Sequence, residues 1–523
     1  MKTEISKHLY LYLFMVIFGI SMSSCKKDHS NKPEPPATPT ALSDADSLKY
    51  LMYQIMQVSF VDGGRDTTYD LPTYYWYKEI PKLDPLSKNY DSADVLLASM
   101  KTYAINPSNE KAYDKYSFLD HGEVQGEIQQ GVSSGDLGIQ VSYAGDGTPS
   151  NTTLYVLFSD KNSPAGQAGV TRGWQITGID GNSVEYDGRN GANVNNVINK
   201  VYNDPNPVSF TFKKPDGTTQ TIKLSKAVYN INPVLFDTIY SVNAKKVGYF
   251  VFNSFAAVEN SSGPTLTKQE LARVFNKFQS AGISSLIVDL RYNGGGSVGT
   301  AEYLDNMIAP ASVQGKEMYH YLYNDKLTAQ VAQQPDFLSQ KVLFNGGSGN
   351  LNLDQVFFIG SSHTASASEL TINNLKPYMS VKLVGQTTYG KPVGFFTFHI
   401  SDFPNGGAEK DLADLYAINF ETRNSINEGG YFNGMVPNSL ARDFVDVPWG
   451  DNTNDENLSQ IFHYISTGSY ARLAIAERID SKQSLKSSIP ATIRPLRFNG
   501  MVDYRISNEI KHVVNKNLRK LNK

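Results

Sequence analysis

The sequence predicts a multidomain α+β protein with three folded parts. These are a mainly helical N-terminal domain over residues 42–130, a β-rich domain over residues 133–226 and an α/β domain over residues 227–475. Apolar residues recur at helical spacing in the first part, and short alternating strands separated by turns dominate the second. In the third part, apolar strands alternate with amphipathic helices, which predicts βαβ units and a parallel or mixed sheet. A chain of 523 residues is long enough for each part to bury its own core.

The N-terminus carries an apolar run, Leu9–Ile20, that two lysines precede. A run of this length predicts the core of a signal peptide rather than a spanning helix. Small residues then lead to Cys25, and the whole segment resembles a bacterial lipoprotein signal. The resemblance implies that residues 1–24 are removed and that lipid is attached to the Cys25 thiol. An ordinary signal peptide with an incidental cysteine is the alternative interpretation.

A proline-rich tether is expected over residues 25–41, which contain Pro33, Pro35, Pro36 and Pro39. Such a composition favours a stiff, extended linker that holds a folded body away from a membrane surface. We therefore expect a lipid-anchored protein of the cell envelope, at the outer membrane and facing either the periplasm or the surface. Cys25 is the only cysteine, so no intramolecular disulfide can form.

The charge balance argues against nucleic acid as a partner. The chain has 48 basic and 51 acidic side chains, which gives a net charge of −3, whereas nucleic-acid-binding domains carry a marked basic excess. No group of histidine, aspartate, glutamate or cysteine residues has metal-ligand spacing, so we expect no metal, and no cofactor is expected either.

The β-rich domain shows the alternation and turns of β-hairpins, for example along Val208, Phe210 and Phe212. Together with its Ser-Pro-Ala, Gly-Trp and Ile-Asp-Gly elements, the segment resembles a PDZ domain. In that resemblance, Leu137, Gly138 and Ile139 stand in the place of the loop whose amides bind a peptide's C-terminal carboxylate while the peptide adds a strand to the sheet. A PDZ-like fold without a peptide-binding role is the alternative.

The stretch from Val356 to Phe396 contains the residues with the clearest chemistry. Its pattern predicts a strand, a helix that opens near Ser366 and ends at Pro377, a second strand, and then a turn that contains Lys391. Strands that leave a sheet at the same edge would bring Ser366 and Lys391 together. A serine needs a base to become a nucleophile, and a lysine in apolar surroundings can be neutral and serve as that base. A serine at a helix N-terminus also favours a developing negative charge.

These residues resemble the signature of the tail-specific, or C-terminal processing, serine peptidases. The shared elements are Ser366-Ala367-Ser368-Glu369, Thr388-Tyr389-Gly390-Lys391 and the segment Asp289-Leu290-Arg291-Tyr292-Asn293-Gly294-Gly295. The resemblance implies a crotonase-like α/β catalytic domain, with Ser366 as nucleophile and Lys391 as general base. It also implies an oxyanion hole formed by the backbone amide of Ala367 and that of Gly294 or Gly295, and it leaves open which glycine contributes.

One position departs from the family. Many members carry a glutamine four residues after the lysine, where it orients the base, but this chain has Phe395. A dyad of Ser366 and Lys391 is therefore expected. Glu369 has two interpretations, as an orienting acid or as a residue that caps the first turn of its helix.

Two other chemistries compete with this interpretation. Gly294, Gly296 and Gly299 satisfy G-x-G-x-x-G after a strand, as in dinucleotide-binding folds, but no acidic residue marks the end of the next strand. A Ser-His-Asp triad would need His363, His320 or His399 to reach Ser366. The G-x-S-x-G pattern of a nucleophile elbow is absent, so no such elbow is expected.

The sequence thus predicts a serine endopeptidase that cleaves protein or peptide substrates. A non-catalytic peptide-binding lipoprotein on a peptidase scaffold is the alternative, which Phe395 favours. Residues 476–523 are expected to form a C-terminal tail with a docked helix, in which Ile506 and Ile510 recur at helical spacing.

Overall fold

A computed structural model describes residues 42–57, 72–122, 124–145, 147–333, 338, 340–345, 351–402, 408, 410–471 and 500–505. The predicted signal peptide, Cys25, the tether and the helix around Ile510 lie outside these residues. The chain divides into two units, residues 1–43 and 44–523, and every element described below belongs to the second. None of the helices in the described ranges is both long enough and apolar enough to cross a membrane.

A six-stranded sheet forms the centre of the α/β domain. Its order is β21 (Ser439–Leu440), β18 (Ser380–Gly385), β17 (Gln355–Gly360), β13 (Ser285–Asp289), β10 (Lys245–Phe252) and β9 (Val234–Val242). All neighbours are parallel except β9, which runs antiparallel to β10. β13 is buried along its whole length, as a strand covered on both faces must be. The predicted βαβ architecture is confirmed.

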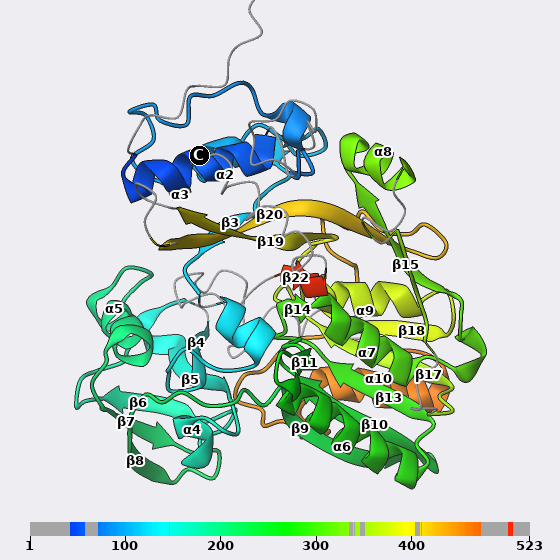
Figure 1. Ribbon diagram of the computed structural model, residues 1–523. Helices are drawn as coiled ribbons and strands as arrows, with labels where there is room; N and C mark the ends of the chain where they lie inside the picture. Colours follow the sequence, from blue (N-terminus) through cyan, green and yellow to red (C-terminus); the bar gives the residue numbers. More distant parts are fainter. Residues whose placement is uncertain are drawn as a thin grey trace, which may run out of the picture. The chain divides into compact units, whose positions relative to one another are not determined.

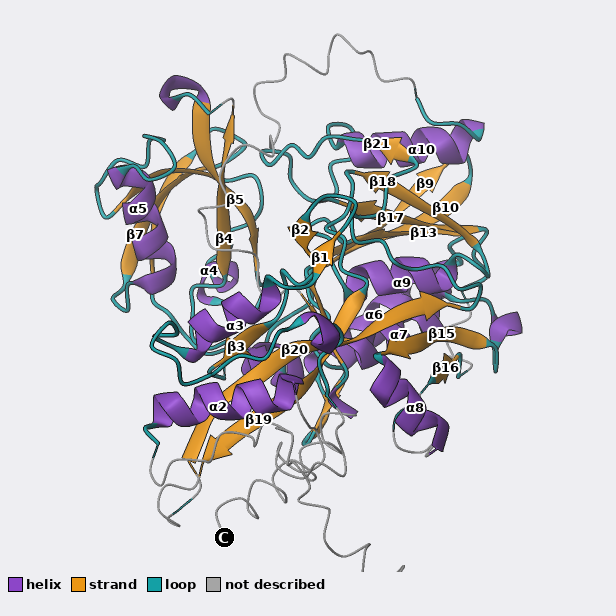
Figure 2. Cartoon of the chain, turned by 90° about the horizontal axis from the view of Figure 1, so that it is seen from above, coloured by secondary structure: helices purple, strands orange, loops and turns teal. Residues whose placement is uncertain are grey.

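Helices cover both faces of this sheet (Figures 1 and 2). The apolar residues of α6 (Leu266–Ala281), α7 (Val298–Ile308) and α9 (Ala367–Leu375) share one core with one face. α10 (Glu456–Thr467) packs on the other face. α9 follows β17 directly, and this order carries the candidate nucleophile to the edge of the sheet.

A second sheet lies on the far side of α7 and α9 from the first (Figure 1). Its order is β14 (Gly295–Ser297), β22 (Gly500–Val502), β19 (Val393–Asp402), β20 (Lys410–Asn424), β15 (Glu317–Tyr323) and β16 (Lys341–Leu343). β22 comes from the segment for which the sequence predicts only a tail outside the domain, and that boundary is wrong. Met501 and Val502 are fully buried, so the burial of their side chains explains why this segment joins the sheet.

The N-terminal part contains α2 (Asp44–Gln57), α3 (Ala93–Lys101), the hairpin β1 (Ile105–Asn106) and β2 (Lys111–Ala112), and β3 (Phe118–Asp120). It is not a separate helical domain as expected. β3 pairs with β20, and the buried side chains of α2 and α3 belong to the same core as the second sheet. Helices this short bury too little surface to stand alone, so they complete a neighbouring core.

The β-rich domain has its own core and an antiparallel sheet of five strands in sequence order. The strands are β4 (Ile139–Gly145), β5 (Thr152–Ser159), β6 (Gln175–Ile179), β7 (Val208–Lys213) and β8 (Thr219–Leu224). α4 (Pro164–Gln167) and α5 (Ala192–Ile198) complete it. Smaller elements elsewhere are β11 (Glu259–Asn260), β12 (Gly263–Pro264) and α8 (Asp325–Gln333).

Candidate active site

Ser366 occupies the turn between β17 and α9 in a strained backbone conformation, with φ 60° and ψ −110°. This conformation costs a residue with a side chain about 1–3 kcal/mol and persists only where the surroundings fix it. The side chain is fully buried, and its Oγ makes no hydrogen bond within the described part of the chain. The sequence predicts no nucleophile elbow because G-x-S-x-G is absent. The structure corrects this, since the strand, the strained serine and the helix follow one another as in such an elbow.

Lys391 lies in the turn between β18 and β19 and is also fully buried. Its Nζ lies 4.0 Å from the centre of the Phe395 ring and 4.9 Å from that of Tyr116. Burial lowers the pKa of Lys391 well below its usual value, and the negative charge of Asp114 only partly opposes this effect. The predicted apolar pocket around Lys391 therefore exists, and Phe395, in the place of the family's glutamine, forms one of its walls.

The carboxylate of Glu369 joins the two turns. Oε2 accepts the backbone N–H groups of Ser366 at 2.9 Å and of Lys391 at 2.8 Å. Oε1 accepts the N–H of Gly390 at 2.8 Å and the hydroxyl of Thr388 at 2.5 Å. One oxygen atom thus holds the backbones of the predicted nucleophile and base next to each other. Burial raises the pKa of Glu369, while these four hydrogen bonds favour the charged form.

Glu369 therefore unites the two interpretations that the sequence allows. It lies in the first turn of α9, as a capping residue does, and it also binds the two turns that carry Ser366 and Lys391. Its contacts with Gly390 and Lys391 could not be derived from local spacing, because they join segments 21 and 22 residues apart.

The glycine-rich segment after β13 lies against the Ser366 turn. The carbonyl oxygen of Asn293 accepts the N–H of Ala365 at 3.1 Å and the hydroxyl of Ser368 at 3.0 Å. The N–H of Gly295 is engaged, since it donates to the Asn293 side chain at 2.9 Å. The N–H groups of Gly294 and Ala367 have no acceptor within the described ranges. The geometry therefore favours Gly294 over Gly295 as the partner of Ala367 in an oxyanion hole.

Sequence reasoning missed the contribution of the N-terminal part. Tyr116 precedes β3, yet its ring faces Lys391 and its hydroxyl donates to the Gly390 carbonyl at 2.6 Å. Asp114 fixes this segment, because its carboxylate accepts the N–H groups of Tyr116 and Ser117 at 2.9 and 2.8 Å. The Tyr116–Gly390 contact joins residues 274 positions apart, and no spacing rule indicates it.

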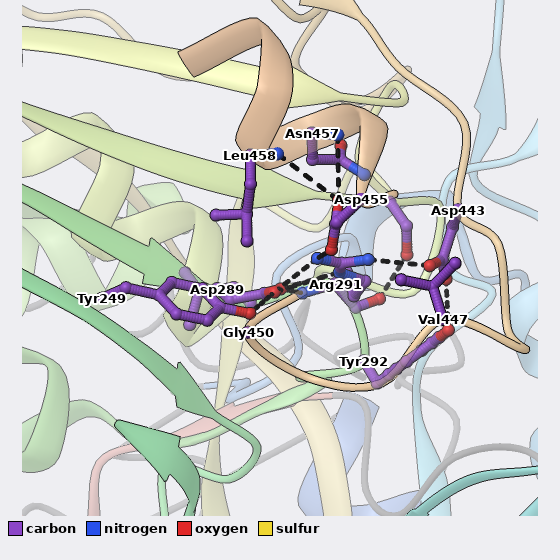
Figure 3. A network of polar contacts seen from close by, with 12 residues as sticks. Tyr249, Asp289, Arg291, Tyr292, Asp443, Val447, Gly450, Asp455, Asn457 and Leu458 are labelled. Carbon is purple, nitrogen blue, oxygen red and sulfur yellow. Dashed lines mark hydrogen bonds and ion pairs between the residues drawn. The ribbon is translucent and has the colours of Figure 1, made fainter. Parts of the chain in front are cut away.

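A buried charge network holds the start of the glycine-rich segment (Figure 3). Arg291 pairs with Asp289, Asp443 and Asp455 at distances of 2.7 to 2.8 Å. Arg172, from the β-rich domain, donates to Asp443 at 2.7 Å. Burial alone would raise the pKa of Asp443, but the two guanidinium groups outweigh it and lower the pKa to about 2. The Asp-Leu-Arg element thus serves as a structural anchor that ties the candidate oxyanion loop to α10 and to the β-rich domain.

The three histidines of a possible triad have other partners. His320 bonds to Glu317 at 2.7 Å, and His399 bonds to Asp414 and Asp411 at 2.7 and 2.8 Å. The His363 ring lies 6.3 Å from that of Tyr292, centre to centre. None of them bonds to Ser366 in the described structure, so the triad has no geometric support. The glycines of G-x-G-x-x-G belong to the segment beside Ser366, which accounts for them without a dinucleotide.

The predicted carboxylate-binding loop has a less open geometry than expected. Leu137 is buried, Gly138 has a positive φ of 66°, and Ile139 begins β4. The Gly138 N–H donates to the carboxylate of Asp136 at 2.7 Å, so an acid already occupies one of the amides that would bind a peptide carboxylate. β4 is nevertheless an edge strand, and its Val141 N–H reaches the hydroxyl of Tyr202 at 3.4 Å.

A serine at a strained strand-to-helix turn, a buried lysine beside it and two unengaged amides define a serine hydrolase type of site. Comparison with known families shows which family of serine hydrolases this segment matches. Residues 246–418, which include all of these groups, match the model of peptidase family S41. The chain therefore carries a domain of the tail-specific, or C-terminal processing, serine peptidase family, as its motifs predict.

Individual relatives agree with this assignment. The chain is 27% identical over 274 residues to the carboxyl-terminal-processing protease of Picosynechococcus sp., covering 52% of this chain and 58% of that protein. It is 25% identical over 277 residues to the carboxy-terminal processing protease CtpA of Bacillus subtilis, covering 50% of each. The chain thus spans little more than half the length of these curated relatives. The crystal structure of a putative S41 protease from Bacteroides fragilis has a similar fold, with a TM-score of 0.58 at 22% identity over 80% of this chain and 96% of that one.

Proposed function

We propose that the chain is a serine endopeptidase in which Ser366 and Lys391 cleave peptide bonds of protein substrates through an acyl-enzyme. The observation that carries the proposal is the Glu369 carboxylate, one oxygen of which binds the backbone N–H groups of both residues. Burying a carboxylate costs desolvation free energy. Its place between the two turns is explained if the reaction requires Ser366 and Lys391 to be held in fixed relative positions. The family of the domain supports the same reaction class.

In the proposed mechanism, neutral Lys391 accepts the Oγ proton as Ser366 attacks the substrate carbonyl carbon. As negative charge develops on the carbonyl oxygen, the N–H groups of Gly294 and Ala367 donate hydrogen bonds to it. The lysine ammonium then gives its proton to the leaving nitrogen, the C–N bond breaks and an ester with Ser366 remains. Water hydrolyses this ester with Lys391 again as the base, which restores both side chains.

The rings of Tyr116 and Phe395 suit this proton shuttle. They exclude water, which keeps Lys391 neutral at rest, and their faces stabilise the ammonium that forms during attack. A carboxylate at the same place would stabilise the ammonium more and would leave the lysine protonated. The aromatic wall thus offers a physical substitute for the orienting amide of the family.

The test is digestion of a labelled, unstructured peptide library. The wild type should release fragments, whereas Ser366→Ala and Lys391→Ala should release none while unfolding at the same denaturant concentration or a higher one. Ser362→Ala, an exposed serine four residues earlier, is the matched control and should cleave like the wild type. Retained cleavage in Ser366→Ala would refute the assignment. A peptide that is bound by the wild type but never cut would indicate the non-catalytic binder instead.

We also propose that the β-rich domain is a PDZ-like module that binds substrate C-termini. The edge position of β4 and its contact with Tyr202 next to α5 support a strand-addition groove. Binding would require the Gly138 amide to exchange its bond with Asp136 for one with the peptide carboxylate. Fluorescence anisotropy with paired peptides tests this, since a free C-terminus should bind more tightly than the same peptide amidated. Equal affinity would contradict the proposal.

For localisation, we propose that lipid on Cys25 anchors the chain in the cell envelope, at the outer membrane. The support is the lipoprotein-like segment that ends at Cys25. Labelled palmitate should enter the wild type and not the Cys25→Ser variant, and only the wild type should sediment with membranes. Equal labelling of both forms would contradict the proposal.

A further inference from the structure

β14, the strand directly after Gly294, has both of its edges occupied. On one edge, the Phe255 N–H donates to the Gly295 carbonyl at 3.0 Å, and the Ser297 N–H donates to the Phe255 carbonyl at 2.7 Å. On the other edge lies β22, with Gly500 in register with Gly295 and Val502 in register with Ser297. β22 lies between β14 and β19 in the second sheet (Figure 1).

The first residue of β22 reaches the candidate oxyanion hole. The Gly500 N–H donates to the Gly294 carbonyl at 3.0 Å. A methyl group placed on Gly295 would lie 2.3 Å from the Gly500 oxygen and 3.0 Å from the Ala367 nitrogen, so both atoms border the same small space. Ser366 and Lys391 are at the same time fully buried. A peptide bond cannot reach Ser366 unless part of the surrounding chain moves.

The two N–H donors of the candidate oxyanion hole determine where a substrate would lie. Its carbonyl oxygen must lie between Gly294 and Ala367, so its backbone must run alongside β14, which starts at Gly295. Extended peptides bind such strands by edge addition. Phe255 is part of the continuous chain between β10 and α6, whereas β22 is a three-residue strand near the C-terminus. The edge that β22 occupies is therefore the one that can be vacated.

We propose that β22 holds the strand position that a peptide substrate takes during cleavage, so that residues 500–502 compete with substrate for the active site. This inference rests on the proposed function and adds the binding mode of the substrate and a built-in competitor. The absence of a side chain at Gly295 allows this close approach of the two backbones, because a Cβ there would clash with the Gly500 carbonyl oxygen.

A polar latch holds β22 in place. Asp503 donates its N–H to the Phe395 carbonyl at 3.1 Å and accepts the Tyr321 hydroxyl at 2.6 Å. Arg505 binds Asp503 at 3.0 Å and Glu302 at 2.8 Å. The Arg505 side chain is 55% exposed, so its replacement can weaken the latch without opening the core.

A reversible crosslink tests the proposal. In a Cys25→Ser background, Ser297→Cys with Val502→Cys places the only two thiols at register partners of β14 and β22. Oxidation should lower cleavage of a labelled peptide at least about tenfold relative to the reduced form of the same protein, because a fixed strand removes the open population. Gln175→Cys with Lys213→Cys, register partners of β6 and β7, is the control pair and should not respond to oxidation. Equal cleavage by the oxidised and reduced forms would overturn the proposal.

Binding to a Ser366→Ala version of each crosslinked protein separates this inference from the proposed function. If peptide binds the reduced form and not the oxidised one, β22 competes with substrate even where no form cuts the peptide, and only the peptidase assignment fails. If both forms bind equally, the inference fails whatever the activity.

The latch gives a second test that needs no crosslink. Arg505→Gln should raise kcat/KM by up to about tenfold, because it removes a charge-assisted hydrogen bond that holds β22 in place. Arg273→Gln is the control: it removes a comparable pair between Arg273 of α6 and Asp237 of β9, and it should leave kcat/KM unchanged. An unchanged or lower value for Arg505→Gln would mean that β22 is only a structural strand.

Discussion

Replacement of Glu369 by glutamine tests the arrangement of the site most directly. The carboxylate accepts four hydrogen bonds, two at each oxygen, and it is fully buried. Glutamine keeps one acceptor oxygen and places an amide NH₂ where the other oxygen was. Either the pair at Ser366 and Lys391 or the pair at Thr388 and Gly390 then faces a donor rather than an acceptor.

The magnitude follows from the number of unmatched donors. In the first arrangement, two buried N–H groups lose their acceptor, and each such loss costs about 1–3 kcal/mol. In the second, Thr388 can turn its hydroxyl and accept from the new amide, so only the Gly390 N–H is lost, at about 1–3 kcal/mol. The protein will adopt the less costly arrangement. We therefore expect Glu369→Gln to lower the free energy of unfolding by about 1–3 kcal/mol and to lower kcat/KM more than KM alone explains.

Chemical denaturation and peptide cleavage measure the two effects. Glu456→Gln is the matched control, because Glu456 also lies in the first turn of a helix, α10, and pairs with Arg442 in a partly buried contact. Its loss should cost less than about 1 kcal/mol through the helix dipole and the ion pair together, and should leave cleavage unchanged. Wild-type stability and activity in Glu369→Gln would refute the reasoning, since they would mean that the carboxyl is protonated and already resembles an amide.

Three further predictions follow from the buried charges. Burial lowers the pKa of Lys391 in the folded state, whereas the unfolded chain protonates this lysine below about pH 10.4. The free energy of unfolding should therefore rise with pH between the two pKa values, and Lys391→Met should abolish that slope and be more stable near neutral pH. The ascending limb of the pH–rate profile should have its midpoint well below the ordinary lysine value. Phe395→Leu removes one ring from the ammonium and should move that midpoint to lower pH, and an unmoved midpoint would exclude the ring from this role. Asp443→Asn should lower the free energy of unfolding by about 3–5 kcal/mol, because it leaves Arg172 and Arg291 underpaired. In acid denaturation, the stability of the wild type should fall as the pH drops from about 4 through about 2, and the variant should lack this slope.

The part of the site that the sequence could predict is the part that local order determines. Ser366 and Lys391 follow consecutive parallel strands, and the carboxyl ends of such strands meet at one edge of the sheet. The spacing and the strand pattern are therefore sufficient to bring them together. Gly294 follows β13, the neighbour of β17 on its other side, and the same rule places it.

The remaining parts depend on contacts that no local pattern records. β22 has only three residues, too few for alternation to show, and it pairs with a strand about 200 positions earlier. The choice between Gly294 and Gly295 depends on the side chain of Asn293, which engages one amide and leaves the other. The strained conformation of Ser366 occurs without the G-x-S-x-G pattern. Glu369, in the first turn of α9, binds the Ser366 N–H, and the Asn293 carbonyl binds the N–H of Ala365 just before it.

The N-terminal part has a physical role that its composition does not indicate. A lysine base needs surroundings dry enough to favour its neutral form, and Phe395 of the α/β core places its ring at the Nζ of Lys391. Tyr116 supplies the second, and its hydroxyl fixes Gly390 in the same turn. If this side of Lys391 were opened to water, the desolvation that lowers its pKa would weaken, and the pKa would move back toward the ordinary lysine value. The chemistry attributed to residues 246–418 therefore depends on a tyrosine 130 positions before the start of that range.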